Sequence, residues 1–426
     1  MTYATGLLCT ICGKTHPYRD DLMTCPDCKE QGILDVRYDY QRMSEVVNRA
    51  YFQQNTLRHM LRYQPLMTIA SYDAQTTLQV GWTPLYHSTN LSKELRLPHL
   101  YFKDEGVNPT ASLKDRASLV ACLKAIEGGH RTICCSSTGN AASSLAGNAA
   151  KLNLNSVIFV PGRSPLGKQA QMLAFGADVI PVDADYNTTY ETSKQFIDAY
   201  GWYNRNAAIN PHLVEGKKTV ALEIAEQLNF QPIHAVFVSV GDGCTIYGVY
   251  KGFFDLWNLG LIEYIPQIYG VQSSGCAPFV EAYQDDRELR PVAESTLADS
   301  IAVGVPRNPV KGMWAVTKSN GRYIAVSDED ILAAQREMAA TEGLFCEPAG
   351  ATGYAGLKQA LKQGWIDRDD RVVVIATGNG LKDTKTFLAH ANPRSAIDPD
   401  QLHRHMQADV PFETILQDID RRGESS

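Results

Sequence analysis

The sequence predicts an α/β protein with two domains and a small cysteine-rich module at its N-terminus. From about His99 onward, short runs rich in β-branched residues alternate with helical patterns, which is typical of parallel βαβ units. Small-residue turns follow several of these runs. Two CxxC pairs between Cys9 and Cys28 predict the N-terminal module. The chain has 426 residues, more than one core needs, so two domains with accessory segments are expected.

The composition excludes several classes of protein. Hydrophobic residues make up 44% of the chain and charged residues 20%, which is an ordinary globular composition. The net charge of −7 and the pI of about 5.8 give no electrostatic basis for binding nucleic acid. No run approaches the roughly 18 apolar residues of a membrane span, and the first residues lack the features of a secretion signal. We therefore expect a cytoplasmic protein with neither nucleic acid nor membrane as partner.

The first module, residues 1–34, carries the pairs "CTIC" (Cys9, Cys12) and "CPDC" (Cys25, Cys28). Two such knuckles can place four thiolates on one tetrahedral ion, and this is the spacing of a zinc ribbon. Four protein ligands leave no position for water, so the zinc would be structural. The alternative is four free cysteines or a redox pair.

The remaining elements follow in order along the chain. We expect residues 35–98 to form a connecting segment. It should be mostly helical and polar over 35–80 and lead to a turn marked by proline. Strands are expected at "HLYFKDE", "RTICCSS", "SVIFVP", "ADVIPV", "AVFVSVG", "QIYGVQ" and "RVVVIATG", with helices between them. We expect a large domain from 99–116 and 206–390, a smaller inserted domain over 117–205, and a polar tail over 391–426.

Three small-residue turns follow three of the predicted strands. They are "SSTGNAAS" (136–143), "VGDGCT" (240–245) and "ATGNG" (376–380). Ligand sites of open parallel sheets gather at the carboxyl ends of the strands, where such turns lie. Glycine permits tight turns, and helix N-termini present free N–H groups to anions. Together the turns predict one binding site.

Lys114 follows a fourth strand, in "NPTASLKDRAS". A buried lysine at a strand-to-helix turn suits imine formation, because desolvation lowers its pKa and frees the amine. The backbone of "GDGCT" suits one phosphate ester, and pyridoxal phosphate requires both features. Neither a P-loop nor a GxGxxG fingerprint is present in the sequence. The alternative is that Lys114 pairs with Asp115 or Glu127 on a helix face.

From about Gly81 to Phe387 the sequence resembles the fold-type II pyridoxal-phosphate enzymes, and within them the threonine synthases. The resemblance is carried by "NPTASLKDRAS", "SSTGNAASS", "NPHLVEGKKT", "VGDGCT", "EPAGATGYAGL" and "TGNGLKD". It implies two three-layer αβα domains with largely parallel sheets, a cofactor cleft between them, a small amino-acid substrate and a homodimer. The cysteine ribbon also resembles that of many members.

The resemblance implies a role for each matching residue. Lys114 would bind the cofactor covalently and shuttle protons at the substrate's Cα, Asn140 would bond the ring 3′-oxygen, and Thr377 would face the pyridine nitrogen. The cofactor phosphate would be cupped by Gly241, Asp242, Gly243, Cys244 and Thr245. The substrate would be held by Ser137, Thr138, Gly139 and Lys168.

The segment "AAINPHLVEGKKT" departs from the family's pattern. Many threonine synthases carry Asn, Ser and Arg ligands for the substrate phosphate where this chain has Ala207, Ala208 and Leu213. Asp242 also stands where the family commonly has Asn, and a carboxylate repels a dianionic substrate. Lys168, Arg163 or Arg307 could compensate.

Three hypotheses follow from these observations. The leading one is threonine synthase, which eliminates the γ-phosphate of O-phospho-L-homoserine and adds water at Cβ. The second is β-elimination or β-replacement on an unphosphorylated amino acid, as in a serine or threonine dehydratase or a diamino acid ammonia-lyase. The third, from another class, is a catalytically inactive binding or regulatory subunit.

Overall fold

The computed structural model describes residues 2–162, 166–391, 399–408, 411–414 and 416, without the side chains of 166–168, 186–187, 401, 405 and 407. The predictions for Arg163 and for the side chain of Lys168 therefore lie outside the described residues. The chain divides into two units, 1–382 and 383–426. The second unit includes the helices α15 (Thr384–Ala389) and α16 (Pro399–Gln407).

A six-stranded sheet lies at the centre of the first unit, with the strand order β12-β11-β10-β13-β5-β4. Neighbouring strands are parallel except for the edge pair β4 and β5. The strands are β4 (Leu85–His87), β5 (Leu100–Asp104), β10 (Ala235–Ser239), β11 (Gln267–Ser273), β12 (Tyr323–Val326) and β13 (Val372–Ala376). The prediction of a largely parallel sheet is confirmed here.

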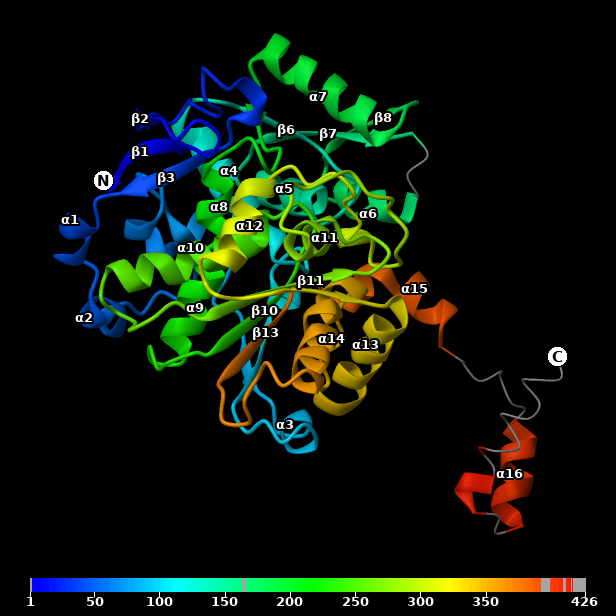
Figure 1. The fold of residues 1–426 in the computed structure, drawn as a ribbon. Helices are drawn as coiled ribbons and strands as arrows, with labels where there is room; N and C mark the ends of the chain where they lie inside the picture. Colours follow the sequence, from blue (N-terminus) through cyan, green and yellow to red (C-terminus); the bar gives the residue numbers. More distant parts are fainter. Residues whose placement is uncertain (1, 163–165, 392–398, 409–410, 415, 417–426) are drawn as a thin grey trace. The chain divides into compact units, whose positions relative to one another are not determined.

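Helices cover both faces of this sheet (Figure 1). Val373 and Ile375 of β13 pack into one core, while Val372, Val374 and Ala376 pack into the other. Both faces are thus apolar, which explains why the strand "VVVIA" reads as a continuous hydrophobic run. The helices on the first face include α9 (Thr219–Gln227) and α10 (Cys244–Asn258), and those on the second α13 (Asp328–Glu342) and α14 (Pro348–Lys362).

A second, four-stranded sheet is wholly parallel and has the order β8-β7-β6-β9. Its strands are β6 (Thr132–Ser136), β7 (Asn155–Pro161), β8 (Asp178–Val182) and β9 (Tyr203–Asn204). Its helices are α4 (Lys114–Glu127), α5 (Asn140–Lys151), α6 (Leu166–Ala174) and α7 (Tyr186–Tyr200). Both sheets belong to the first unit, and the domain boundaries stay a prediction.

The N-terminal module is a three-stranded antiparallel sheet with the order β2-β1-β3. Its strands are β1 (Ala4–Cys9), β2 (Thr15–Pro17) and β3 (Leu34–Tyr38), with the short 3₁₀ helix η1 (Lys29–Gln31) before β3. Cys9 ends β1 and Cys12 lies in the loop that follows, while Cys25 and Cys28 lie between β2 and β3, so the sheet brings both pairs to one end of the module.

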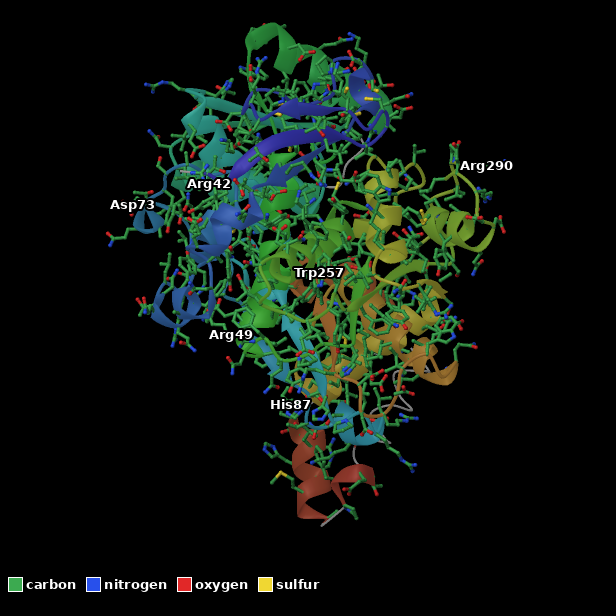
Figure 2. The ribbon with its side chains drawn as sticks, turned by 60° about the vertical axis from the view of Figure 1, so that its left-hand side comes forward. Arg42, Arg49, Asp73, His87, Trp257 and Arg290 are labelled. Carbon is green, nitrogen blue, oxygen red and sulfur yellow. The ribbon has the colours of Figure 1, made fainter. Side chains whose placement is uncertain are left out.

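The prediction of a mostly helical, polar segment over 35–80 was wrong. Residues 34–38 form a strand, and the helices that follow are short: α1 (Tyr40–Ser44), α2 (Arg49–Gln54) and the 3₁₀ helices η2 (Met60–Leu66) and η3 (Ala74–Thr76). Leu61 and Tyr63 are fully buried, whereas Arg42, Arg49 and Asp73 point outward (Figure 2). The segment therefore packs its apolar residues through short turns, which give no helical period.

The remaining elements of the first unit connect the sheets and their covering helices. They are α3 (Leu91–Glu94), η4 (Glu105–Val107), α8 (His212–Lys217), α11 (Pro278–Gln284), η5 (Asp299–Ile301), α12 (Pro309–Thr317) and η6 (Gly380–Asp383). Over the described ranges, every helix is too short or too polar to cross a lipid bilayer.

A buried charge cluster anchors helix α4 two residues after its start. Arg116 donates to Glu105 from Nε and Nη2 at 2.7 Å, and to Glu223 from Nη1 at 2.6 Å and Nη2 at 2.7 Å. Lys103 donates to Glu223 at 2.8 Å, and all four side chains are fully buried. Two cations thus balance two carboxylates with bidentate geometry, which such burial requires. The cluster ties α4 to β5 and α9.

Candidate active site

Lys114 is placed by a turn that is bonded to the end of strand β13. Leu113 N–H donates to the carbonyl of Thr377 at 2.9 Å, and Asn379 N–H donates to the carbonyl of Ala111 at 3.0 Å. Ala111 has a φ of 65°, in the left-handed region, where a small side chain is tolerated better than a bulky one. These bonds hold Lys114 as the first residue of α4, at the carboxyl ends of β5 and β13.

Asp115 stabilises the same turn and does not pair with Lys114. Its two carboxylate oxygens accept from the backbone N–H and the hydroxyl of Thr110, both at 2.8 Å, and from Asn148 at 2.9 Å. Glu127 instead accepts from Lys124 at 2.7 Å. The alternative in which Lys114 forms a helix-face ion pair with either carboxylate is therefore wrong.

One cavity brings together the predicted cofactor residues from four strand ends. They come from the turns after β5, β6, β10 and β13, which belong to two different sheets. The residues predicted to hold the cofactor that line this cavity are Lys114, Asn140, Gly241, Asp242, Gly243, Cys244, Thr245 and Thr377. Their chemical roles stay predictions.

The loop before α10 has the backbone that a phosphate requires. Gly243 has a φ of 85°, and a Cβ there would lie 2.7 Å from the carbonyl oxygen of Asn308, so glycine is needed twice over. The carbonyl of Asp242 accepts from Asn308 N–H at 3.1 Å, and its carboxylate accepts from Arg307 N–H at 3.2 Å. The loop is thus fixed by residues 307 and 308, and α10 begins directly after Gly243, so its first backbone N–H groups could bind an anion.

Asn140 is held by a partner that the motif alone does not reveal. Its amide nitrogen donates to Glu347 Oε2 at 2.7 Å, and Glu347 lies at the N-terminus of α14 with its own backbone N–H bonded to Gly378. The three residues before Asn140 form the turn after β6, in which Gly139 N–H donates to Ser137 Oγ at 3.2 Å. Ser137, Thr138 and Gly139 therefore lie next to the cavity in the chain but are not among the residues that line it.

Two cations of the cavity were missed by the sequence analysis. Burial, then the charges of Lys217 and Arg205, lower the pKa of Lys114 to about 8. Lys217 and Arg205 both line the cavity and are almost fully buried. The motif "VEGKKT" contains two adjacent lysines, and the second, Lys218, pairs with Glu215 at 2.5 Å and Asp255 at 2.6 Å.

The lowered pKa of Lys114 predicts how cofactor capture depends on pH. The neutral amine is the nucleophile, and a pKa near 8 rather than 10.5 makes it available at lower pH. The rate at which the cofactor-free protein recombines with pyridoxal phosphate should rise up to about pH 8 and then level off. Stopped-flow absorbance from pH 7 to 10.5 measures this, and a rate that still climbs steeply above pH 9 would contradict it.

The residues of the cavity fit pyridoxal phosphate. An amine with a lowered pKa lies opposite a helix N-terminus whose loop has room for an anion. The side chain of Asn308 is buried beside that loop and contacts the thiol of Cys244. The first backbone N–H groups of α10 have no partner within the helix, and a phosphate oxygen would satisfy them.

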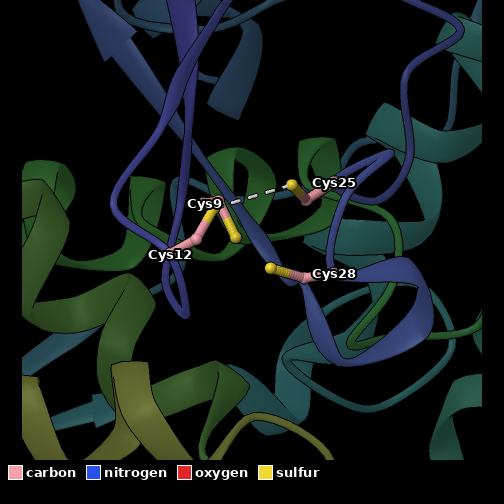
Figure 3. A group of neighbouring side chains, drawn as sticks. All are labelled: Cys9, Cys12, Cys25 and Cys28. Atoms are coloured by element: carbon pink, nitrogen blue, oxygen red, sulfur yellow. Dashed lines mark hydrogen bonds between the residues drawn. The ribbon is translucent and has the colours of Figure 1, made fainter.

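The four predicted metal ligands gather at one point (Figure 3). The Sγ atoms of Cys9, Cys12, Cys25 and Cys28 all lie within 4.8 Å of one another, and those of Cys12 and Cys25 are 3.9 Å apart. Thiolates on a tetrahedral ion with bonds of about 2.3 Å would be separated by roughly 3.8 Å. A Cβ on Gly32 would lie 2.5 Å from that of Cys25, so glycine permits this approach. The donor set fits zinc.

The comparisons with known proteins agree with this geometry. Residues 76–378 match the family described as "Pyridoxal-phosphate dependent enzyme". The chain is 38% identical to the threonine synthase of Methanocaldococcus jannaschii over 378 aligned residues, which make up 88% of this chain and 92% of that enzyme. It is 35% identical to the threonine synthase of Methanosarcina acetivorans over 395 aligned residues, which make up 92% of this chain and 96% of that enzyme.

Solved structures show the same fold at lower identity. Threonine deaminase isoform 2 of Solanum lycopersicum superposes with a TM-score of 0.64 at 22% identity, over 78% of this chain and 92% of that one. Diaminopropionate ammonia lyase of Escherichia coli superposes with a TM-score of 0.62 at 19% identity, over 82% and 91%. These likenesses establish the shared architecture.

Proposed function

The chain belongs to the threonine synthase family of pyridoxal-phosphate-dependent lyases, and we propose that it converts O-phospho-L-homoserine and water to L-threonine and phosphate. The observation that carries this proposal is the cavity that joins Lys114, Asn140, Thr377 and the loop of residues 241–245. It occurs in a chain that matches curated threonine synthases over almost their whole length.

The net reaction changes bonds at two carbons of the substrate, Cβ and Cγ. The Cγ–O bond breaks and phosphate leaves with the bonding electrons, while the oxygen of water ends on Cβ. Cβ loses one proton, and Cγ gains one to become the methyl group of threonine. When bound, pyridoxal phosphate supplies an electron sink for the negative charge that develops on the substrate.

The side chains of this protein would provide the proton transfers and the orientation. Lys114, whose pKa of about 8 leaves part of the amine neutral near physiological pH, would take the Cα proton and return it. Asn140, fixed by Glu347, would orient the cofactor ring, and the hydroxyl of Thr377 would face the ring nitrogen without enforcing its protonation. The substrate carboxylate would bind at Ser137, Thr138 and Gly139, and Lys168 would assist with the phosphate.

A turnover assay tests the proposed reaction directly. The protein loaded with pyridoxal phosphate should release phosphate from O-phospho-L-homoserine and form one threonine for each phosphate, followed by a coupled phosphate assay and by proton NMR. L-Serine, L-threonine and 2,3-diaminopropionate serve as the comparison panel. Ammonia and a 2-oxo acid from that panel, with no phosphate released from O-phospho-L-homoserine, would reject the proposal.

The second candidate function is elimination or replacement on an unphosphorylated amino acid. It is favoured by Ala207, Ala208 and Leu213, which supply no anion ligand. Leu213 is fully buried in an apolar core, and Ala208 packs with Ile33 and Cys244. Bound cofactor without turnover on any of these amino acids would instead support the third candidate, an inactive binding subunit.

We also propose that the four cysteines hold a structural zinc ion. Mass spectrometry should find about one zinc per native chain. Cys25→Ser should lose the metal, because a hydroxyl is a poor substitute for a thiolate, whereas Cys276→Ala, outside the cluster, should keep it. A native protein free of metal would contradict the assignment.

The family resemblance further supports a cytoplasmic homodimer. Mass photometry of the purified protein tests the assembly, and a single species of 47.0 kDa would contradict it.

A further inference from the structure

Arg205 and Lys217 enter the cavity from two different elements. Arg205 follows β9, and its backbone N–H donates to the carbonyl of Cys134 at 2.9 Å. Its Nε and Nη2 both donate to Ser118 Oγ, at 3.2 and 3.0 Å, so the guanidinium is fixed in the cavity wall. Lys217 is the last residue of α8. Arg205 is only 1% exposed and Lys217 only 2%.

Neither cation is matched by an acid. Among the described residues, Arg205 donates to Ser118, and neither Arg205 nor Lys217 forms an ion pair with a carboxylate. Asp242 is the one carboxylate among the residues that line the cavity, against Lys114, Arg205 and Lys217. Burial lowers the pKa of both Arg205 and Lys217, which reflects the cost of these charges. The wall therefore has a surplus of positive charge that an anion would relieve.

The neighbouring lysine shows that this surplus is local. Lys218 points the other way, into a fully buried group with Glu215 and Asp255, where its charge is balanced. Lys217 lies one helical turn after Leu213, and its Cβ lies close to Gly248 of α10. The two adjacent lysines therefore differ in their surroundings: Lys218 is paired with carboxylates in the protein core, and Lys217 lines the cavity.

The surrounding groups define the chemistry of the anion. The charges of Lys217 and Arg205 both act on the thiol of Cys244, in the loop at the N-terminus of α10. Two cations and a row of backbone N–H groups suit a dianion with several oxygens better than a single carboxylate. A guanidinium with one free edge and a compact ammonium are the usual side chains for phosphate.

We propose that Lys217 and Arg205 bind a phosphate monoester in this cavity. This inference rests on the proposed function, because it requires a phosphorylated cofactor or a phosphorylated substrate. Lys217 supplies positive charge within the segment whose expected anion ligands are replaced by Ala207, Ala208 and Leu213, and Arg205 lies two residues before that segment. It also offsets the repulsion from Asp242, the acid of the cofactor loop.

To test whether Lys217 and Arg205 bind a phosphate, the affinity for each phosphorylated ligand is compared with the affinity for the same ligand without its phosphate. Lys217→Met and Arg205→Met are compared with Lys217→Arg, which keeps the charge, and with Lys151→Met, which removes an exposed lysine at the end of α5. The first comparison titrates cofactor-free protein with pyridoxal 5′-phosphate and with pyridoxal by fluorescence. The second titrates the loaded protein with O-phospho-L-homoserine and with L-homoserine by absorbance. If Lys217→Met does not fold, Lys217→Gln takes its place.

The expected result is selective loss of affinity for a phosphorylated ligand. Lys217→Met should lower the affinity for one phosphorylated ligand by about tenfold to a hundredfold and leave the affinity for its unphosphorylated counterpart unchanged. Lys217→Arg, which keeps the charge, should restore the affinity for the phosphorylated ligand. A loss for pyridoxal phosphate assigns the pair to the cofactor, and a loss for O-phospho-L-homoserine assigns it to the substrate.

Two results would overturn the inference. One is unchanged affinity for both phosphorylated ligands; the other is an equal loss with and without the phosphate, which would mean a structural role. If the wild-type protein releases no phosphate from O-phospho-L-homoserine, the proposed function fails. In that case the titrations with pyridoxal 5′-phosphate and pyridoxal, which require no turnover, are sufficient to decide whether the pair binds a phosphate.

Discussion

Replacement of Lys114 by alanine is expected to lower kcat by at least about a thousandfold, since the variant loses both the covalent link to the cofactor and the group that moves the Cα proton. The fold should persist, because the turn before Lys114 is held by backbone bonds to Thr377 and Asn379 and by Asp115. Phosphate release from O-phospho-L-homoserine measures the loss.

Two further measurements separate this effect from misfolding. After reduction with borohydride, mass spectrometry should find the cofactor on the peptide that contains Lys114 in the wild type and nowhere in Lys114→Ala. The exposed control Lys151→Ala should keep full activity. A Lys114→Ala protein that still turns over at a tenth of the wild-type rate would exclude Lys114 as the catalytic lysine.

Replacement of Arg116 by methionine is expected to lower the free energy of unfolding by about 3–5 kcal/mol, the usual cost of breaking a buried ion pair. The change leaves Glu105 and Glu223 buried, with only Lys103 to balance them. Burial opposes ionisation of Glu223, but the charges of Arg116 and Lys103 outweigh burial and lower its pKa to about 2. Urea denaturation at pH 7 measures the loss.

The matched control is Arg290→Met, because Arg290 is exposed on the surface (Figure 2). It should change the free energy of unfolding by less than about 0.5 kcal/mol. Adding Glu105→Gln to Arg116→Met should recover part of the loss, since one unpaired carboxylate is removed. An Arg116→Met protein as stable as the wild type would show that the cluster contributes nothing to the fold.

Local patterns were sufficient to predict the strands β5–β8, β10, β11 and β13, the glycine turns and the cysteine pairs, but not the short strands β4, β9 and β12 or the strands of the N-terminal module. Each of these depends on neighbours in the chain: a β-branched run buried on both faces, as in β13, or a glycine that must adopt a positive φ, as at Gly243. The meeting of the turns after β5, β10 and β13 follows from parallel strands that end at one edge of the same sheet, whereas the turn after β6 comes from the second sheet. The chemical roles of these residues stay predictions.

The cations of the cavity wall could not be predicted in the same way. Whether Lys217 or Lys218 faces the cavity depends on the rotation of α8 by about 100° per residue against its neighbours, which the sequence does not state. Arg205 is separated by 87 residues from Ser118, the hydroxyl that orients it. The prediction for residues 35–80 was wrong for a related reason: their apolar side chains are buried by short turns, which leave no helical period in the sequence.

Turnover in ¹⁸O-labelled water tests the central claim most directly. If the chain eliminates phosphate by breaking the Cγ–O bond and adds water at Cβ, threonine should carry one ¹⁸O atom on its hydroxyl. The released phosphate should then carry none, as mass spectrometry of both products would show. Label in the phosphate with homoserine as the product, or a 2-oxo acid with no threonine, would contradict the account.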